Sequence, residues 1–125
     1  MKGKLTQNKV HLEDHEYDTV KLLMANGYDV ELIPPAKIQG LRMPDIRMLG
    51  TAWEMKSPEG NGKNTLKNAV QNASHQSDSI IIDLRRTTIQ DQDAVKELQK
   101  QFELSRRLKR MKVICKDENI LDFKK

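Results

Sequence analysis

Residues 43–58, MPDIRMLGTAWEMKSP, constrain the fold most, because they predict two short strands joined by a tight turn at Gly50-Thr51. The pairs expected from a two-residue turn are Leu49/Ala52, Met48/Trp53, Arg47/Glu54, Ile46/Met55 and Asp45/Lys56. Side chains alternate along a strand, so this register gives the hairpin one apolar face and one charged face. The apolar face carries Ile46, Met48, Trp53 and Met55, and the charged face carries Asp45, Arg47, Glu54 and Lys56.

Two carboxylates and a lysine on one face of a hairpin are the components of a metal-dependent phosphodiesterase site. Mg²⁺ prefers oxygen ligands, and one or two carboxylates hold it while substrate phosphate completes its shell. The ion polarises the phosphoryl oxygen and lowers the pKa of a bound water, and Lys56 would stabilise the developing charge. The alternative interpretation is a solvated strand face with cross-strand ion pairs, which contribute little to stability. For the Pro-Asp…Glu-x-Lys pattern alone that alternative is favoured, because such short patterns recur by chance.

Length and composition indicate one globular domain over residues 12–125 behind a loose basic arm at residues 1–11. Mean hydropathy is -0.72, but apolar residues recur with helical and strand periods, which argues against disorder. No apolar run approaches the ~20 residues of a membrane span, and the N-terminus lacks a secretory signal. Single Cys115 excludes an internal disulfide, and the net charge of +4 is compatible with a nucleic-acid partner.

The periodicities predict the order helix, strand, strand, strand, helix, strand, helix, strand. The expected elements are a helix from Leu12 to Asn26-Gly27, a strand at 28–33, the hairpin, helices at 65–76 and 90–107, and strands at 79–84 and 111–115. A strand–helix–strand crossover after a meander predicts an α/β fold with a mixed β-sheet flanked by helices.

Four other features each have a structural and a functional interpretation. Glu16 lies in the first turn of its helix, where its negative charge either interacts favourably with the helix dipole or completes the metal site. The turn-rich loop at 57–64 is either a plain surface loop or a mobile loop at the mouth of the site. His75 is favoured as a surface histidine over a general base. Arg85-Arg86 either contact phosphate or are simply solvated.

Five segments in this order resemble a known family. They are NGYDVELIPP at 26–35, PDI at 44–46, WEMKSPEG at 53–60, KNTLKNAVQNASHQSDSIIIDLRR at 63–86 and the closing DENILDFKK. Together they resemble the PD-(D/E)XK nuclease superfamily, and more narrowly the C-terminal tRNase toxin domains of CdiA-type contact-dependent growth inhibition effectors. The resemblance runs from about Leu12 to the end, and the joint order is far more specific than the short nuclease pattern.

The resemblance implies a restriction-endonuclease-like αβββαβ core plus a C-terminal helix and strand. It implies an endonuclease that hydrolyses RNA, in the first place tRNA, with a divalent metal: Mg²⁺ first, with Mn²⁺ or Zn²⁺ as alternatives. By position it assigns Asp45 and Glu54 as metal carboxylates, the Met55 backbone carbonyl as a further ligand, Lys56 as the catalytic lysine and Glu16 as an assisting acid. It places Ser57, Asn64, Thr65, Gln71 and His75 along the substrate cleft.

A domain of this kind is expected to act in the cytoplasm and to be neutralised by a cognate immunity protein. The toxin domains end very long secreted proteins, whereas this chain opens with Met1 and no delivery region is found in it. It is therefore expected to be an excised domain or a free-standing relative on a mobile element or phage. Two alternatives remain: a DNA endonuclease of restriction or resolvase type, and a non-catalytic nucleic-acid-binding module with the same fold.

Overall fold

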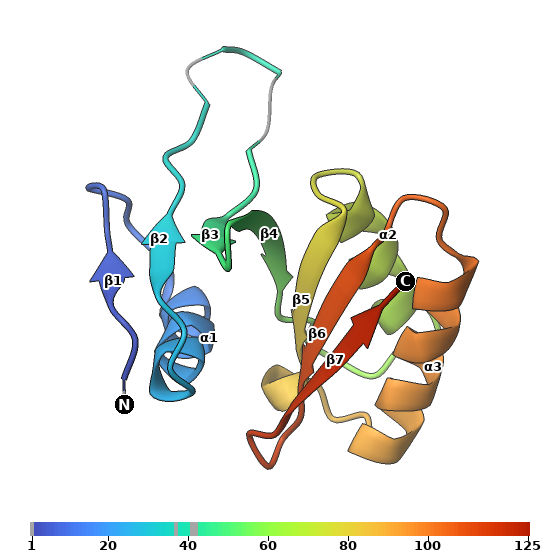
Figure 1. The fold of residues 1–125 in the computed structure, drawn as a ribbon. Coiled ribbons are helices and arrows are strands. Elements are labelled where there is room, and N and C mark those ends of the chain that lie inside the picture. Colours follow the sequence, from blue (N-terminus) through green and yellow to red (C-terminus); the bar gives the residue numbers. More distant parts are fainter. Residues whose placement is uncertain (1, 37, 41–42) are drawn as a thin grey trace. The chain divides into compact units, whose positions relative to one another are not determined.

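The computed structural model describes residues 2–36, 38–40 and 43–125, and it confirms the predicted α/β fold with a mixed sheet (Figure 1). The elements are β1 (Leu5–Thr6), α1 (Asp14–Ala25), β2 (Val30–Leu32), β3 (Ile46–Met48), β4 (Thr51–Lys56), α2 (Thr65–Ser74), β5 (Ser79–Asp83), the 3₁₀ turn η1 (Leu84–Arg86), α3 (Asp91–Leu104), β6 (Arg110–Ile114) and β7 (Ile120–Lys124). The seven strands follow one another in the sheet in chain order. Three neighbouring pairs are parallel, β1/β2, β4/β5 and β5/β6, and the other three are antiparallel.

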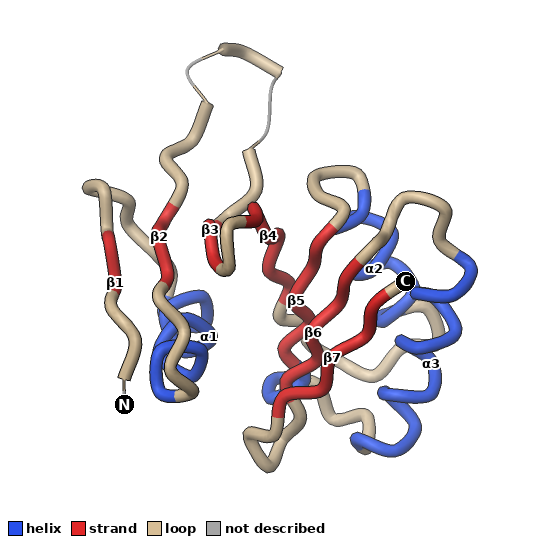
Figure 2. The backbone as a smooth tube through the Cα atoms, in the orientation of Figure 1, coloured by secondary structure: helices blue, strands red, loops and turns tan. Residues whose placement is uncertain are grey.

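The chain divides into two compact units, Met1–Trp53 and Glu54–Lys125, and the division falls inside β4. Strand β1 lies in the segment that was predicted to be a loose arm, and its Leu5 and Thr6 pair in parallel with Val30 and Glu31 of the same unit. Figure 2 shows this short strand in the N-terminal segment.

The first unit has a core made by alternation along its strands and by one stripe of α1. Strands β2 and β3 bury every second residue, as expected for strands with one covered face. The buried residues of this unit are Thr19, Val20, Leu23, Val30, Leu32, Ile46, Met48 and Trp53.

The turn between β3 and β4 lies at Leu49-Gly50, one residue earlier than predicted. The observed pairs are Met48/Thr51, Arg47/Ala52 and Ile46/Trp53, so the register predicted for the hairpin was wrong. Leu49 has φ +57° and Gly50 has φ +73°, and a two-residue type I′ turn requires positive φ at both positions. Glycine therefore takes the second position of the turn and not the first.

The two faces of the hairpin are nevertheless as predicted. Moving the turn by one residue shifts the cross-strand pairs by two, and a shift of two leaves each side chain on its own face. Ile46, Met48, Trp53 and Met55 are all buried. The Trp53 indole Nε1 also donates to the Met48 carbonyl over 2.9 Å, which satisfies its polar atom inside the core. Arg47 is exposed, and its ion-pair partner is Glu31, at 3.8 Å.

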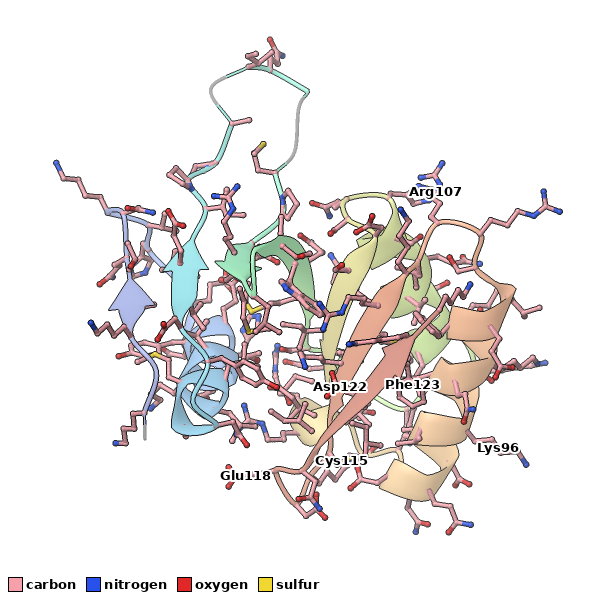
Figure 3. The ribbon with its side chains drawn as sticks, in the orientation of Figure 1. Lys96, Arg107, Cys115, Glu118, Asp122 and Phe123 are labelled. Atoms are coloured by element: carbon pink, nitrogen blue, oxygen red, sulfur yellow. The ribbon has the colours of Figure 1, made fainter. Side chains whose placement is uncertain are left out.

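The second unit is built around β5, whose five residues are all buried, as a central strand predicts. Helices α2 and α3 lie on one face of β5–β7 (Figure 1). Their inner stripes and that face form one apolar cluster of Leu66, Val70, Ala73, Ile80, Ile82, Leu84, Ala94, Leu98, Phe102, Leu108, Met111, Val113 and Cys115. The periodicities predict no strand after residue 115, but the C-terminal tail forms β7, which pairs with β6. Its Phe123, labelled in Figure 3, stacks at an angle on Phe102 with ring centroids 6.1 Å apart.

Among the described helices none combines the length and the apolar character needed to cross a membrane.

Candidate functional site

The pair Glu54 and Lys56 lies where β4 ends. Glu54 pairs with Ile80 and Lys56 with Ile82 in the parallel β4–β5 ladder. Since paired residues of neighbouring strands point to the same side, both side chains lie on the face that α2 and α3 cover. Lys56 Nζ is 3.5 Å from Glu54 Oε2.

The exposure of this pair is uneven. Glu54 is buried, with 4% of its surface exposed, whereas the Lys56 side chain is 29% exposed. Burying an ionised carboxylate is costly unless a positive charge or hydrogen bonds compensate it, and the Lys56 ammonium supplies that charge. The arrangement therefore holds a desolvated carboxylate and a solvent-reaching cation side by side at the carboxyl end of a parallel strand.

Asp45, the first carboxylate of the predicted site, is half-buried just before β3. Its amide donates to the Trp53 carbonyl over 3.0 Å, and its carbonyl accepts from the Ile33 amide at the same distance. Asp45 belongs to the first unit and the pair of Glu54 and Lys56 to the second. The structure thus brings together the second and third members of the predicted site, and their grouping with Asp45 stays a prediction.

Met55 is buried between Glu54 and Lys56 in β4 and pairs with Ile81 of β5. Its side chain points to the opposite face from theirs, as the alternation predicts. The role of its carbonyl as a metal ligand stays a prediction.

Glu16, the assisting acid implied by the resemblance, has a visible structural role. Its Oε1 accepts from the Glu13 amide over 3.0 Å, and the Glu13 side chain in turn accepts from the backbone of Glu16. This reciprocal capping box satisfies two amides that the first turn of a helix leaves without partners. The structure therefore supports the helix-start interpretation, and the catalytic role stays a prediction.

The predicted substrate-cleft residues on α2 fall into two groups. Asn64 precedes the helix and Thr65 begins it, whereas Gln71 and His75 lie in and after its last turns. At 1.5 Å per residue the two ends are roughly 15 Å apart. Gln71 lines a groove of about 390 Å³ between α2 and α3, and His75 Nδ1 lies 2.8 Å from the Arg107 guanidinium (Arg107 is labelled in Figure 3).

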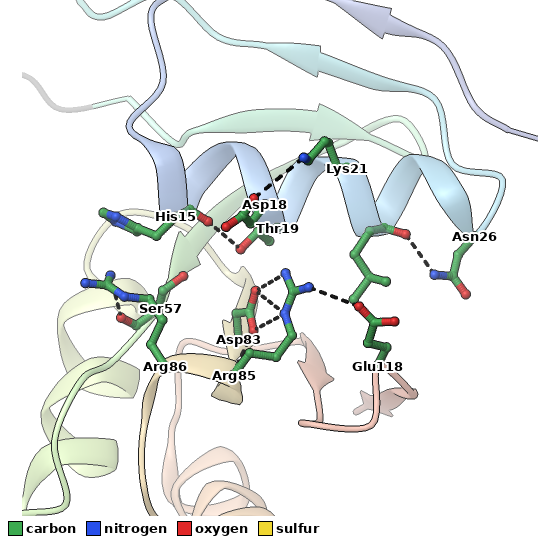
Figure 4. A network of polar contacts seen from close by, with 11 residues as sticks. His15, Asp18, Thr19, Lys21, Asn26, Ser57, Asp83, Arg85, Arg86 and Glu118 are labelled. Atoms are coloured by element: carbon green, nitrogen blue, oxygen red, sulfur yellow. Dashed lines mark hydrogen bonds and ion pairs between the residues drawn. The ribbon is translucent and has the colours of Figure 1, made fainter.

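Ser57 leads to a contact that sequence reasoning did not find. Its carbonyl accepts from Arg86 Nη1 over 3.3 Å (Figure 4), and the same guanidinium forms an ion pair with Glu59. One residue on, the Thr87 hydroxyl donates to the Gly60 carbonyl, and these two residues also form an isolated parallel bridge. The loop after β4 is thus fastened to the segment after β5. The sequence could have indicated this contact only through the expectation that β4 and β5, if parallel, end at the same edge of the sheet.

Arg85 has a different environment. Its guanidinium and backbone amide bond both carboxylate oxygens of buried Asp83 at 2.8–3.3 Å, and Nη1 reaches Glu118 at 3.5 Å (Figure 4). Neither arginine of the Arg85-Arg86 pair is simply solvated.

Within the described residues one group combines three side chains of metal-ligand type: Asp91, Cys115 and Asp117. Its carboxylate oxygens already have partners, because the Asp91 carboxylate accepts from the Lys116 amide at 3.1–3.3 Å and Asp117 accepts from Asn119 at 2.9–3.0 Å. Burial raises the pKa of the Cys115 thiol, and the two carboxylates raise it further. The group is therefore accounted for by the start of α3 and the β6–β7 turn.

The fold has a counterpart among solved structures. A chain of the CdiA-CT/CdiI toxin and immunity complex from Burkholderia pseudomallei superimposes with a TM-score of 0.72 and 18% sequence identity, over 98% of this chain and 100% of that one. At that identity the likeness establishes the fold alone. No curated protein matches the sequence.

The sequence also matches a family. Residues 42–120, well over half of the chain, match the family described as the contact-dependent growth inhibition CdiA C-terminal domain. The chain belongs to this family, which confirms the resemblance to CdiA C-terminal toxin domains, whereas the tRNase activity and the PD-(D/E)XK superfamily stay predictions. Membership indicates a toxin domain of contact-dependent growth inhibition.

Proposed function

We propose that this chain is a metal-dependent endonuclease that hydrolyses phosphodiester bonds in tRNA and acts as a growth-inhibition toxin domain in the cytoplasm of a target cell. The observation that carries the proposal is the close pair of Glu54 and Lys56 at the end of β4, in a member of the CdiA C-terminal domain family. The assignment to the PD-(D/E)XK superfamily is part of this proposal.

The donor set fits a divalent cation. Asp45 and Glu54 offer carboxylate oxygens and Met55 offers a backbone carbonyl, so every proposed ligand atom is oxygen, which suits Mg²⁺ and also admits Mn²⁺ or Zn²⁺. When bound, such a cation supplies polarisation of a phosphoryl oxygen and a lowered pKa of water.

The protein's own residues have separate roles in this proposal. Lys56 reaches solvent from beside a buried carboxylate, so its ammonium is available to a phosphoryl oxygen that gains charge during the reaction. Glu54 keeps that ammonium in place, since the buried carboxylate attracts it more strongly than an exposed one would. The net charge of +4 assists the approach of a polyanion.

A cognate immunity protein belongs to the proposal as the partner. The Burkholderia pseudomallei counterpart was solved as a toxin and immunity complex, and this chain shares the fold of a chain in it. Co-expression of the neighbouring reading frame should protect cells that express this chain, and growth arrest that persists during co-expression would remove the partner from the proposal.

Incubation of the purified full chain with bulk tRNA and with plasmid DNA tests the activity. We expect tRNA fragments with Mg²⁺, no fragments with EDTA, and intact plasmid. Asp45→Ala, Glu54→Gln and Lys56→Ala should each abolish cleavage while the circular dichroism spectrum is kept. Chelator-sensitive cutting of the plasmid and not of tRNA would identify a DNA endonuclease. Salt-sensitive tRNA binding without chelator-sensitive turnover would identify a non-catalytic binding module.

A further inference from the structure

The end of β5 places an arginine beside the proposed site. Lys56 pairs with Ile82 in the parallel β4–β5 ladder, so the chain leaves both strands at the same edge of the sheet. Ser57 follows Lys56 on one side, and Arg86 lies in η1 on the other, with 3.3 Å between Arg86 Nη1 and the Ser57 carbonyl. The carboxyl ends of parallel strands are where α/β proteins bind ligands.

The two adjacent arginines differ in how firmly they are held. Arg85 is fixed by several bonds to Asp83, a carboxylate whose side chain is only 5% exposed, and is therefore part of the fold. Arg86 is paired instead with Glu59, whose side chain is 64% exposed, in the loop after β4. Exposed ion pairs are weak, because water competes for both charges. Of the two arginines, Arg86 is therefore the one whose acidic partner a competing anion can replace more easily.

We propose that Arg86 binds a phosphate group of the nucleic-acid substrate, and that Glu59 holds its guanidinium until the phosphate replaces the carboxylate. The inference rests on the proposed function and adds to it a substrate-binding residue and a built-in competitor. A guanidinium binds two phosphate oxygens in parallel, which a lysine ammonium does not. The Ser57 carbonyl holds the guanidinium at the residue that follows Lys56, so we expect the bound phosphate close to the proposed chemistry.

The exchange of Glu59 for phosphate has a measurable consequence. Removal of the competitor should strengthen binding, and removal of the arginine should weaken it and make the effect of Glu59 disappear. The two effects are therefore coupled, which a merely structural role of the Arg86–Glu59 pair does not predict. Loss of the pair as a structural contact would instead weaken binding in both single variants.

The test measures binding of fluorescently labelled bulk tRNA to the full chain in EDTA, by anisotropy at several salt concentrations. Arg86→Ala should raise Kd roughly tenfold, since a charge-assisted contact is lost, and should reduce the log Kd against log salt slope by about 0.7–0.9. Glu59→Gln should lower Kd about two- to fivefold, the range expected for an exposed pair. The double variant should match Arg86→Ala alone.

Lys96→Ala is the matched control, because Lys96 is an exposed cation on α3 (Figure 3) and its removal changes the net charge equally. It should change Kd less than twofold. Arg86→Lys keeps the charge without the planar fork and should give an intermediate Kd. If Arg86→Ala fails to fold, as judged by thermal melting, the other two variants test the inference. Arg86→Lys should then have a higher Kd than wild type, and Glu59→Gln a lower one.

An Arg86→Ala variant with wild-type Kd and salt slope would overturn the inference, and so would a Glu59→Gln variant that binds no more tightly than wild type. Either result, with tRNA still cleaved by the wild-type chain, leaves the proposed function intact. Wild-type protein that neither binds nor cleaves tRNA would overturn the proposed function, and the inference with it.

Discussion

Lys56 Nζ lies 3.5 Å from Glu54 Oε2, and the two residues are separated in β4 by one residue that points to the other face. The glutamate is buried and the lysine reaches solvent. The lysine therefore serves the fold by neutralising a desolvated carboxylate, and it remains available to a substrate. Mutation can separate these two roles of Lys56, the stabilisation of the fold and the contact with substrate.

Lys56→Met should lower the free energy of unfolding by about 1–2 kcal/mol, less than for a fully buried pair because Lys56 is partly exposed. Glu54→Gln should be milder, since it leaves no buried charge. In the double variant Glu54→Gln/Lys56→Met stability should return while tRNA cleavage stays at least about 100-fold below wild type. Urea denaturation and gel assays measure the two quantities.

Arg47→Ala is the control for this series, because Arg47 is exposed and its ion pair with Glu31 is long, at 3.8 Å. It should change the free energy of unfolding by less than about 1 kcal/mol and leave cleavage unaltered. A Lys56→Met protein as stable and as active as wild type would contradict both duties assigned to Lys56.

Glu16 can be tested for its two interpretations with one pair of substitutions. Glu16→Ala removes the acceptor for the Glu13 amide and should cost about 1 kcal/mol of stability. Glu16→Gln keeps an oxygen acceptor and should keep stability close to wild type. If cleavage falls sharply in Glu16→Gln while the melting temperature holds, Glu16 assists catalysis as well as capping. Full cleavage in Glu16→Gln restricts Glu16 to the capping box.

Leu49 is a site where the wild-type residue is strained. It adopts φ +57° with 54% of its surface exposed, a conformation that costs most L-residues about 1 kcal/mol and favours asparagine or glycine. Leu49→Asn should therefore raise the free energy of unfolding by about 0.5–1 kcal/mol, measured by urea denaturation.

Gly50→Ala tests the same turn in the opposite direction. Among the described residues, apart from the two chain neighbours of Gly50, no atom lies within 4 Å of the added Cβ. The cost is therefore that of the positive φ of +73°, and stability should fall by about 1 kcal/mol. A Leu49→Asn protein less stable than wild type would show that the leucine side chain contributes more than its strain costs.

Most of the helices and strands could be predicted because their residues carry strong periodic signals. The continuous apolar run at 79–84 predicts a strand covered on both faces, and β5 is that strand. The hairpin register could not be predicted, since it depends on a leucine adopting positive φ. Strand β1 has only two residues, too few for any alternation to be visible.

The candidate site was predictable only where it is local in sequence. Glu54 and Lys56 share a face because they are two residues apart in a strand. The contact of Arg86 with Ser57 and Glu59 joins segments 27–29 residues apart and depends on β4 and β5 being parallel neighbours. Residue types alone do not fix that pairing, so the sequence left Arg85-Arg86 open between a phosphate contact and solvation.

The Cys115 thiol should react slowly with alkylating reagents. Its raised pKa should also make the fold less stable at high pH. Burial first, and then Asp91 and Asp117, raise the pKa of its thiol (Figure 3 shows Cys115 at the end of β6). Above the ordinary thiol pKa of about 8.5 the unfolded chain releases the proton while the folded chain retains it. The unfolded state then binds fewer protons, so the free energy of unfolding falls as pH rises through that range.

Iodoacetamide labelling followed by mass spectrometry measures the thiol directly, and its rate should rise at a higher pH than in a free cysteine peptide. Asp91→Asn keeps an oxygen acceptor for the Lys116 amide but removes the negative charge, so the labelling profile should move to lower pH. Asp93→Asn, in the same first turn of α3, is the matched control and should leave the profile unchanged. Cys115→Ala should lack the loss of stability at high pH. A labelling profile equal to that of the free peptide would refute the effect of burial and of both carboxylates.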